Sequence, residues 1–140
     1  MSALDEVVAL QRFSAARVTV LGTVAGSGQP HLVPVTAAVA EATVVFAVDS
    51  KPKTTVRLRR LRNIAENPRV SFLADEYDDD WARLWWVRVD AVAEILRAGP
   101  RHEAALDVLA AKYHQYRTSR PAGVVVSARI TGIVGWAARP

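Results

Sequence analysis

Alternation of apolar and polar residues is clearest between positions 84 and 96. One face of this segment carries Trp85, Val87, Val89, Ala91, Ala93 and Ile95, and the other carries Trp86, Arg88, Asp90, Val92 and Glu94. A period of two residues is typical of a strand with one buried face. We therefore predict a long strand here. Trp86 stands on its charged face, where an indole is expected to be covered by a ligand, a second subunit or a neighbouring element.

Shorter segments rich in β-branched residues predict five further strands, at 17–24, 31–40, 43–48, 70–75 and 124–136. Tight turns separate several of them, with Gly26 and Gly28 in the first turn and Glu41-Ala42 in the second. Pro34 cannot donate to a strand ladder, so the strand at 31–40 is expected at a sheet edge or interrupted. About six strands joined by short turns favour a small antiparallel barrel.

Helical periodicity predicts three helices. The first covers 2–14, with Ser2 and Asp5 resembling a capping arrangement, and the second covers 54–66 and stops at Asn67-Pro68. The third begins at Gly99-Pro100 and continues to about residue 116. Its expected buried stripe consists of Leu106, Leu109, Ala110 and Tyr113.

The length of 140 residues and a hydrophobic fraction of 51% indicate one globular domain, residues 1–140. The chain contains no cysteine, which excludes disulfides and thiolate chemistry. No apolar run is long enough for a membrane helix, and the N-terminus lacks a signal-peptide pattern. A cytoplasmic protein is therefore expected.

Positive charge is concentrated in one segment. The chain has 18 Lys and Arg against 14 Asp and Glu, and six of these cations fall between positions 51 and 62 without an acid: Lys51, Lys53, Arg57, Arg59, Arg60 and Arg62. Thr54 and Thr55 stand beside them at the expected helix entrance. Threonine caps and the helix dipole both favour an anion there. The alternative from composition alone is a solvated basic helix face.

Several common catalytic motifs are missing. The three histidines form no close metal-ligand pair, and two of them are expected to face solvent. Gly26 and Gly28 lack the third glycine and the following helix of a dinucleotide fingerprint. The five carboxylates at 75–80 lack the spacing of a calcium loop, so they are interpreted as solvated or salt-paired, near the basic helix. Any catalysis would then depend on a cofactor.

The order of several segments resembles a known superfamily. HLVPV, VVFAVD, NPRVSFL and WVRVDAVAEIL follow one another as in the split β-barrel flavin-binding superfamily of pyridoxamine 5′-phosphate oxidase. The segments KPKTT and DDDW..LWWVRV resemble its actinobacterial branch of coenzyme F420-dependent enzymes. The resemblance covers nearly the full chain. It implies a mainly β fold, a six-stranded antiparallel split β-barrel with flanking helices.

The resemblance also implies roles for particular residues. The backbone of Pro34, Val35 and Thr36 would face the edge of the deazaflavin or flavin ring. The ribityl and phosphate part would be surrounded by Val48, Ser50, Lys51, Lys53 and Thr54. Arg57 or Arg60 would reach the acidic tail of coenzyme F420, and Trp86 would lie over the cofactor. A homodimer with each cofactor in the subunit interface is implied as well.

The function implied first is an F420H2-dependent reductase that passes a hydride to a small organic substrate. The residues assign no catalytic acid or base and no metal site. One alternative is an FMN-dependent oxidase or reductase of the same fold. Another is a non-catalytic module that binds a cofactor or nucleic acid, although nucleic acid is the less favoured ligand. The substrate-binding residues of the oxidase itself have no clear counterpart, so pyridoxamine phosphate is not the expected substrate.

Overall fold

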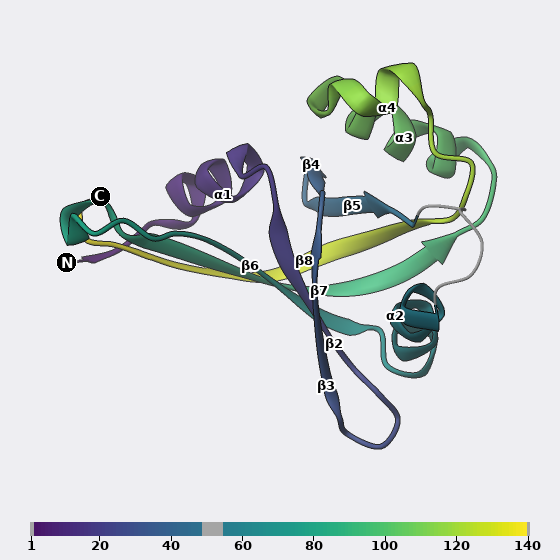
Figure 1. Ribbon diagram of the computed structural model, residues 1–140, viewed down its shortest axis with the longest axis horizontal. Coiled ribbons are helices and arrows are strands. Elements are labelled where there is room, and N and C mark those ends of the chain that lie inside the picture. Colours follow the sequence, from purple (N-terminus) through teal and green to yellow (C-terminus); the bar gives the residue numbers. More distant parts are fainter. Residues whose placement is uncertain (1, 49–54, 140) are drawn as a thin grey trace.

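The computed structural model describes residues 2–48 and 55–139, without the side chains of residues 55–58. Figure 1 shows a strongly bent sheet with helices on its flanks. The helices are α1 (Glu6–Ala15), α2 (Thr55–Glu66), α3 (Pro100–Lys112) and α4 (His114–Thr118), with a 3₁₀ turn η1 (Trp81–Arg83). The strands are β1 (Ser2–Ala3), β2 (Thr19–Val24), β3 (Pro30–Val35), β4 (Ala38–Ala40), β5 (Thr43–Ala47), β6 (Arg69–Glu76), β7 (Trp85–Leu96) and β8 (Val125–Ala137).

All strand pairs are antiparallel. The sheet has the order β3-β2-β6-β7-β8-β5-β4, and β1 pairs with β8 outside this path. β3 and β4, which follow each other in sequence, therefore stand at opposite ends of the order. The prediction of a mainly β antiparallel fold with flanking helices is confirmed.

The number of strands differs from the six that the sequence predicted, because the described part of the chain contains eight. The segment at 31–40 is divided into β3 and β4 at Thr36 and Ala37, and Ser2–Ala3 adds β1. The Ala37 carbonyl accepts hydrogen bonds from the Lys112 and Tyr113 side chains. These side chains come from the end of α3 and the residue after it, distant in sequence, so the position of the break could not be anticipated locally; Pro34 itself lies within β3.

Two predicted helix boundaries are also corrected. Asp5, not Ser2, caps α1, since its carboxylate accepts a hydrogen bond of 2.9 Å from the Val8 N–H. The predicted third helix breaks at Tyr113, whose extended φ and ψ of −116° and 117° separate α3 from α4. The break turns the Tyr113 hydroxyl toward the Arg17 and Ala37 carbonyls.

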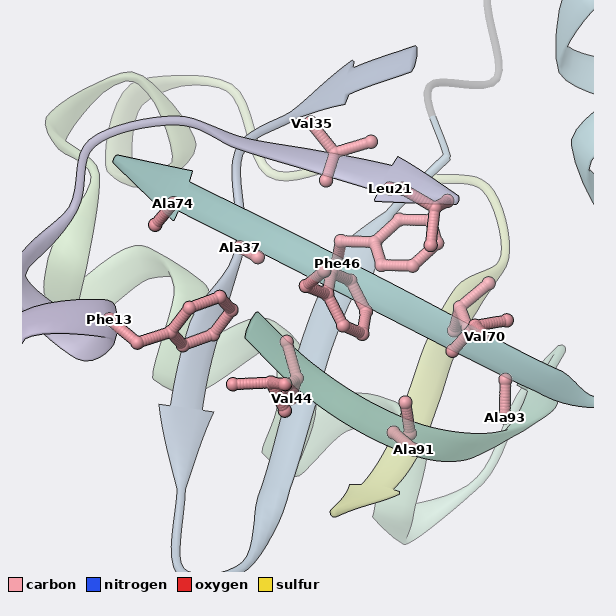
Figure 2. Packing of buried hydrophobic residues seen from close by; sticks show 14 of the residues in the cluster. Phe13, Leu21, Val35, Ala37, Val44, Phe46, Val70, Ala74, Ala91 and Ala93 are labelled. Carbon is pink, nitrogen blue, oxygen red and sulfur yellow. The ribbon is translucent and has the colours of Figure 1, made fainter. Parts of the chain in front are cut away.

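The main core fills the inside of the bent sheet (Figure 2). Phe13 from α1 and Phe46 from β5 both contact Phe72 of β6 edge to face, with ring centroids 6.0 and 6.2 Å apart. A second cluster lies beneath α3 and consists of Ala38, Val45, Ala105, Leu106, Leu109, Tyr113 and Val125. Strand alternation explains the division, because consecutive residues of β5 contribute to different clusters.

Helix α2 packs beside the β2–β3 hairpin. Asn63 is buried and donates to the Thr23 hydroxyl at 3.0 Å, and Glu66 accepts from the Gly26 N–H at the same distance. The acidic turn between β6 and β7 lies at the opposite end of the molecule (Figure 1). The expectation that it lies near the basic helix is wrong, and Asp78 instead pairs locally with Arg83 at 3.4 Å.

None of the helices in residues 2–48 and 55–139 combines the length and the apolar character needed to cross a membrane.

Candidate substrate and cofactor site

The predicted ring-edge residues lie where β3 ends. Pro34 and Val35 belong to β3, and Thr36 begins the corner that leads to β4. Within the described ranges β3 pairs only with β2, so the prediction of an edge strand at Pro34 is confirmed. The other side of an edge strand presents backbone groups for hydrogen bonding to a ligand.

Val35 and Val48 have buried side chains that belong to the main core. The Val48 N–H donates to the Val124 carbonyl at 2.9 Å. The side chains of these two residues are therefore committed to packing, and only their remaining backbone groups are available to a cofactor.

The other predicted cofactor residues, apart from Trp86, lie in the basic segment at 51–62 or next to it. Ser50, Lys51, Lys53 and Thr54 lie outside the described residues, and Arg57 is described only as backbone of α2. Arg60 is half-buried on the same helix.

Trp86 is half-buried near the start of β7, between its cross-strand partners Asp75 and Trp136. The segment after α2 reaches β7 seven residues further on, where the Ala93 N–H donates to the Pro68 carbonyl. A strand rises about 3.3 Å per residue, so Trp86 lies roughly 20 Å along β7 from Ala93. Within one chain, the structure does not bring Trp86 and α2 together.

A polar pocket of about 430 Å³ opens beside the end of β3. It is lined by Arg17, Thr36, Tyr113, Gln115 and Tyr116. These residues come from the segment after α1, the β3–β4 corner and the α3–α4 junction. Only Thr36 was among the predicted site residues. Sequence reasoning missed the others because the pocket joins segments that lie about 80 to 100 positions apart, and its one local signal is the Tyr113–Tyr116 pair.

Aromatic and polar groups are combined in this pocket. The Tyr116 and Thr36 hydroxyls are hydrogen-bonded at 2.9 Å, and the Tyr113 and Tyr116 rings meet edge to face at 5.8 Å. The guanidinium carbon of Arg17 lies 4.7 Å from the centre of the Tyr113 ring. No carboxylate is among the described residues that line the pocket. A planar molecule carrying a carbonyl or anionic oxygen suits this combination of a cation, hydroxyls and aromatic rings.

Two neighbouring side chains hold the pocket walls in place: Lys112, the last residue of α3, and Tyr113, which follows it. The Lys112 ammonium donates to the Ala16 and Ala37 carbonyls, both at 2.7 Å. The Tyr113 hydroxyl lies 2.9 Å from the Arg17 carbonyl and 3.1 Å from the Ala37 carbonyl. These contacts fix the backbone on which Arg17 and Thr36 stand.

Burial shifts the pKa values of both groups. It lowers the pKa of Lys112 to about 8, with a smaller contribution from the nearby charge of Arg17. It raises the pKa of Tyr113, because the phenolate is less well solvated than the phenol.

A larger hollow of about 610 Å³ lies on the outer face of the sheet, across β2, β3, β6, β7 and β8. Ser71 donates to Asp90 on its floor at 2.7 Å. Leu32 is 71% exposed at its wall, and Leu73 and Val134 are exposed on the same face. The outer face is thus both hollowed and partly apolar.

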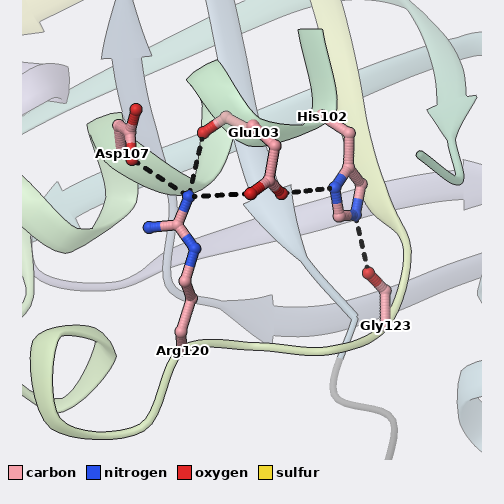
Figure 3. A network of polar contacts seen from close by, with 5 residues as sticks. All are labelled: His102, Glu103, Asp107, Arg120 and Gly123. Atoms are coloured by element: carbon pink, nitrogen blue, oxygen red, sulfur yellow. Dashed lines mark hydrogen bonds and ion pairs between the residues drawn. The ribbon is translucent and has the colours of Figure 1, made fainter. Parts of the chain in front are cut away.

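The histidines differ from the expectation that two face solvent, since only His114 is exposed. His102 is buried and contacts the Gly123 carbonyl at 2.9 Å, within a network that also includes Glu103, Asp107 and Arg120 (Figure 3). This network attaches the start of α3 to the segment before β8.

His31 lies opposite Thr23, on the face of the β2–β3 hairpin where Asn63 of α2 reaches Thr23. Its Nδ1 atom is buried without a hydrogen-bond partner among the described residues. The sequence did not single out His31 as a site residue, yet an orphaned nitrogen beside the basic helix fits the polar part of a ligand.

No group of three or more His, Cys, Asp or Glu residues in the described part of the chain could hold a metal ion.

A family model described as Pyridoxamine 5′-phosphate oxidase matches residues 5–137. Among solved structures, an FAD-binding protein from Mesorhizobium loti is 23% identical, with coverage of 96% of this chain and 95% of that chain and a TM-score of 0.75. The conserved hypothetical protein Rv2991 from Mycobacterium tuberculosis is 21% identical, with coverage of 97% and 86% and a TM-score of 0.77. An FAD-binding protein from Mycobacterium smegmatis is 20% identical, with coverage of 97% of each chain and a TM-score of 0.64.

These structural similarities, at 20 to 23% identity, establish the fold and not the ligand. No curated protein matches the sequence.

Proposed function

The chain belongs to the pyridoxamine 5′-phosphate oxidase family, and we propose that it is an oxidoreductase that uses a flavin or deazaflavin cofactor. One observation carries the proposal. The polar pocket of Arg17, Thr36, Tyr113, Gln115 and Tyr116 opens at the corner that follows β3, and it shares Thr36 with the residues proposed to hold the ring edge of the cofactor. A substrate in this pocket would therefore lie next to the ring.

A bound flavin or deazaflavin supplies hydride transfer, and the chain supplies binding and orientation. The backbone at Pro34–Thr36 would hold the ring edge, and the buried Nδ1 of His31 offers one partner to the polar part of the cofactor. Arg17 and Tyr116 would bind an oxygen of the substrate. The substrate class that these groups suit is a planar conjugated carbonyl compound or aromatic anion.

Coenzyme F420 is the cofactor that we propose first. Its phosphate, lactate carboxylate and glutamate tail carry more negative charge than FMN, and the six cations at 51–62 suit such a ligand. The names of the FAD-binding relatives favour the flavin alternative. Coenzyme F420 would thus pair with more of the cations at 51–62 than FMN would.

A homodimer forms part of the proposal. Because Trp86 lies roughly 20 Å along β7 from Ala93, which the segment after α2 contacts, a cofactor held by α2 of one chain would be covered by Trp86 of a second copy. The exposed Leu32, Leu73 and Val134 on the outer face suit contact with that copy. Analytical ultracentrifugation checks this part, and a monomer at micromolar concentration would contradict it.

The proposed function is tested by fluorescence titration of the purified protein with coenzyme F420, FMN and FAD in turn. We expect micromolar or tighter binding of F420 and weaker binding of both flavins. Preference for a flavin would replace F420 by that cofactor in the proposal. Failure to bind any of the three would contradict a cofactor-dependent function.

The matched variants Lys53→Ala and Arg59→Ala separate a specific phosphate contact from general positive charge. Lys53→Ala is expected to weaken cofactor binding by about 1.5–3 kcal/mol, as for a hydrogen bond to a charged group. Arg59 is exposed on α2, so its removal is expected to cost less. Equal losses in the two variants would remove Lys53 from the site.

A further inference from the structure

Lys112 does not itself line the polar pocket. Its ammonium donates to the Ala16 and Ala37 carbonyls, which are adjacent in sequence to the pocket residues Arg17 and Thr36. Its Nζ atom lies 5.1 Å from the centre of the Tyr113 ring, and Arg17 lies over the same ring at 4.7 Å. Two cations are therefore held around one aromatic side chain. The part of the chain that the structure describes places no carboxylate in hydrogen-bond or ion-pair contact with either cation.

We propose that Lys112 is a positioning residue that couples binding of a planar anion in the polar pocket to the uptake of a proton. The proposal rests on the proposed function in so far as that pocket is the substrate site. Arg17 pairs with the anion, and Lys112 responds to the change in charge at Arg17.

The charged and titratable groups around Lys112 determine how its protonation responds to a bound anion. Arg17, from the segment after α1, is the charge that disfavours the ammonium form, in addition to burial. Tyr113, at the junction of α3 and α4, faces Lys112 with its ring, and Tyr116 of α4 packs against Tyr113. Asp75 and Glu76 of β6 line a second hollow together with Arg17. The β3–β4 corner supplies Thr36 and Ala37, which do not titrate. An anion bound to Arg17 offsets its positive charge, so the ammonium form of Lys112 becomes more favourable. By thermodynamic reciprocity, protonated Lys112 then favours the bound anion.

The hydrogen bonds act in the same direction. The ammonium makes charge-assisted bonds to the Ala16 and Ala37 carbonyls, and these bonds weaken when the amine becomes neutral. The segments that carry Arg17 and Thr36 are then held less firmly. Loss of the proton near pH 8 therefore lowers the affinity of the pocket.

Global stability responds to the same proton in the opposite sense. The pKa of Lys112 is about 8 in the folded chain and 10.5 in the absence of the fold. Between these pH values the unfolded chain binds more protons, so the contribution of Lys112 to the unfolding free energy rises with pH. If Lys112 had only a structural role, loss of its charge would lower both the unfolding free energy and the affinity of the pocket.

The experiment uses 2-naphthoate, a planar aromatic carboxylate, as the probe, without any cofactor. Isothermal titration calorimetry at pH 8 in two buffers of different ionisation enthalpy measures the protons taken up on binding. We expect fractional uptake by the wild type and an affinity that falls about three- to tenfold between pH 7 and pH 9.5, since one pKa unit corresponds to a tenfold change.

Two variants assign the proton. Lys112→Arg retains a cation that does not titrate in this range, so binding is expected without proton uptake and with little change between pH 7 and pH 9.5. Lys112→Met is expected to bind more weakly and also without uptake. Uptake that persists in Lys112→Met would overturn the proposal, as would the absence of naphthoate binding to the wild type.

A second measurement does not depend on the folding of a variant. The ¹³Cε chemical shift of Lys112 follows its protonation by NMR, and naphthoate is expected to move the midpoint to higher pH. An unchanged midpoint at saturating naphthoate overturns the proposal. Because no cofactor is present, a failed cofactor titration would contradict the proposed function and leave this coupling intact.

Discussion

The main core around Phe46 and Phe72 (the barrel core) and the second cluster beneath α3 (the α3 cluster) both exclude water, but different kinds of side chain surround them. The barrel core consists of apolar side chains from α1, α2 and most of the strands, with no charged member. The α3 cluster includes Tyr113, and Lys112 and Arg17 lie against its edge. The first cluster therefore contributes mainly hydrophobic free energy, whereas the second also fixes polar groups around a pocket.

The difference separates stability from site geometry. Apolar contacts in the barrel core are non-directional, so they hold the sheet without orienting any ligand group. The hydrogen bonds of Lys112 and Tyr113 are directional and join α3 to the backbone at Ala16, Arg17 and Ala37. Substitutions in the first cluster should change stability more than binding, and those in the second should change both.

The largest effect is expected for Phe72→Ala. Phe72 is fully buried and contacts both Phe13 and Phe46, so the substitution should lower the unfolding free energy by about 3–5 kcal/mol. Urea denaturation measures this loss. The matched control is Val7→Ala on α1, because Val7 is 68% exposed and lies outside the proposed dimer contact, so it should change stability by about 0.5 kcal/mol or less. Similar losses in the two variants would contradict the assignment of Phe72 to the core.

A smaller loss of stability is expected for Tyr113→Phe. The substitution keeps the ring in the α3 cluster and removes the hydroxyl that bonds the Arg17 and Ala37 carbonyls. The Ala37 carbonyl keeps the Lys112 ammonium as a donor, whereas the part-buried Arg17 carbonyl loses the hydroxyl, so the loss should be about 1–2 kcal/mol. Naphthoate affinity should also fall because Arg17 is less well placed. Tyr77→Phe is the control, since Tyr77 is 68% exposed. An unaltered affinity in Tyr113→Phe would show that its hydroxyl does not shape the pocket.

The contrast between the clusters also explains what the sequence could predict. The faces of β7 follow alternation, and Val87, Val89, Ala91 and Ala93 are buried as expected. Periodicity likewise placed Leu106, Leu109 and Tyr113 on the buried side of the predicted third helix, whereas Ala110 of the same predicted stripe is only half-buried. Such patterns are local, because the position of a residue within its own strand or helix decides whether its side chain faces the core.

The pocket could not be predicted in the same way. Its walls depend on contacts between Lys112 and Ala16, and between Tyr113 and Arg17, about a hundred positions apart. The break after Lys112 also needs the distant Arg17 and Ala37 carbonyls as partners for Tyr113. Of the residues that line the pocket, the family resemblance indicated only Thr36, because it lies beside the Pro34 motif.

The smallest effect is expected for Asp5→Ala at the start of α1. Loss of the hydrogen bond from the Val8 N–H should cost about 1 kcal/mol, as for other N-caps. Thermal denaturation measures this loss. Ser2→Ala is the matched control, because Ser2 belongs to β1 and caps no helix, and it should lower stability less. Fraying at Asp5 is far from Arg17, which follows the other end of α1, so naphthoate affinity should be unchanged. If Asp5→Ala weakened naphthoate binding, α1 would transmit changes from the barrel core to the pocket, and the separation of the two regions would fail.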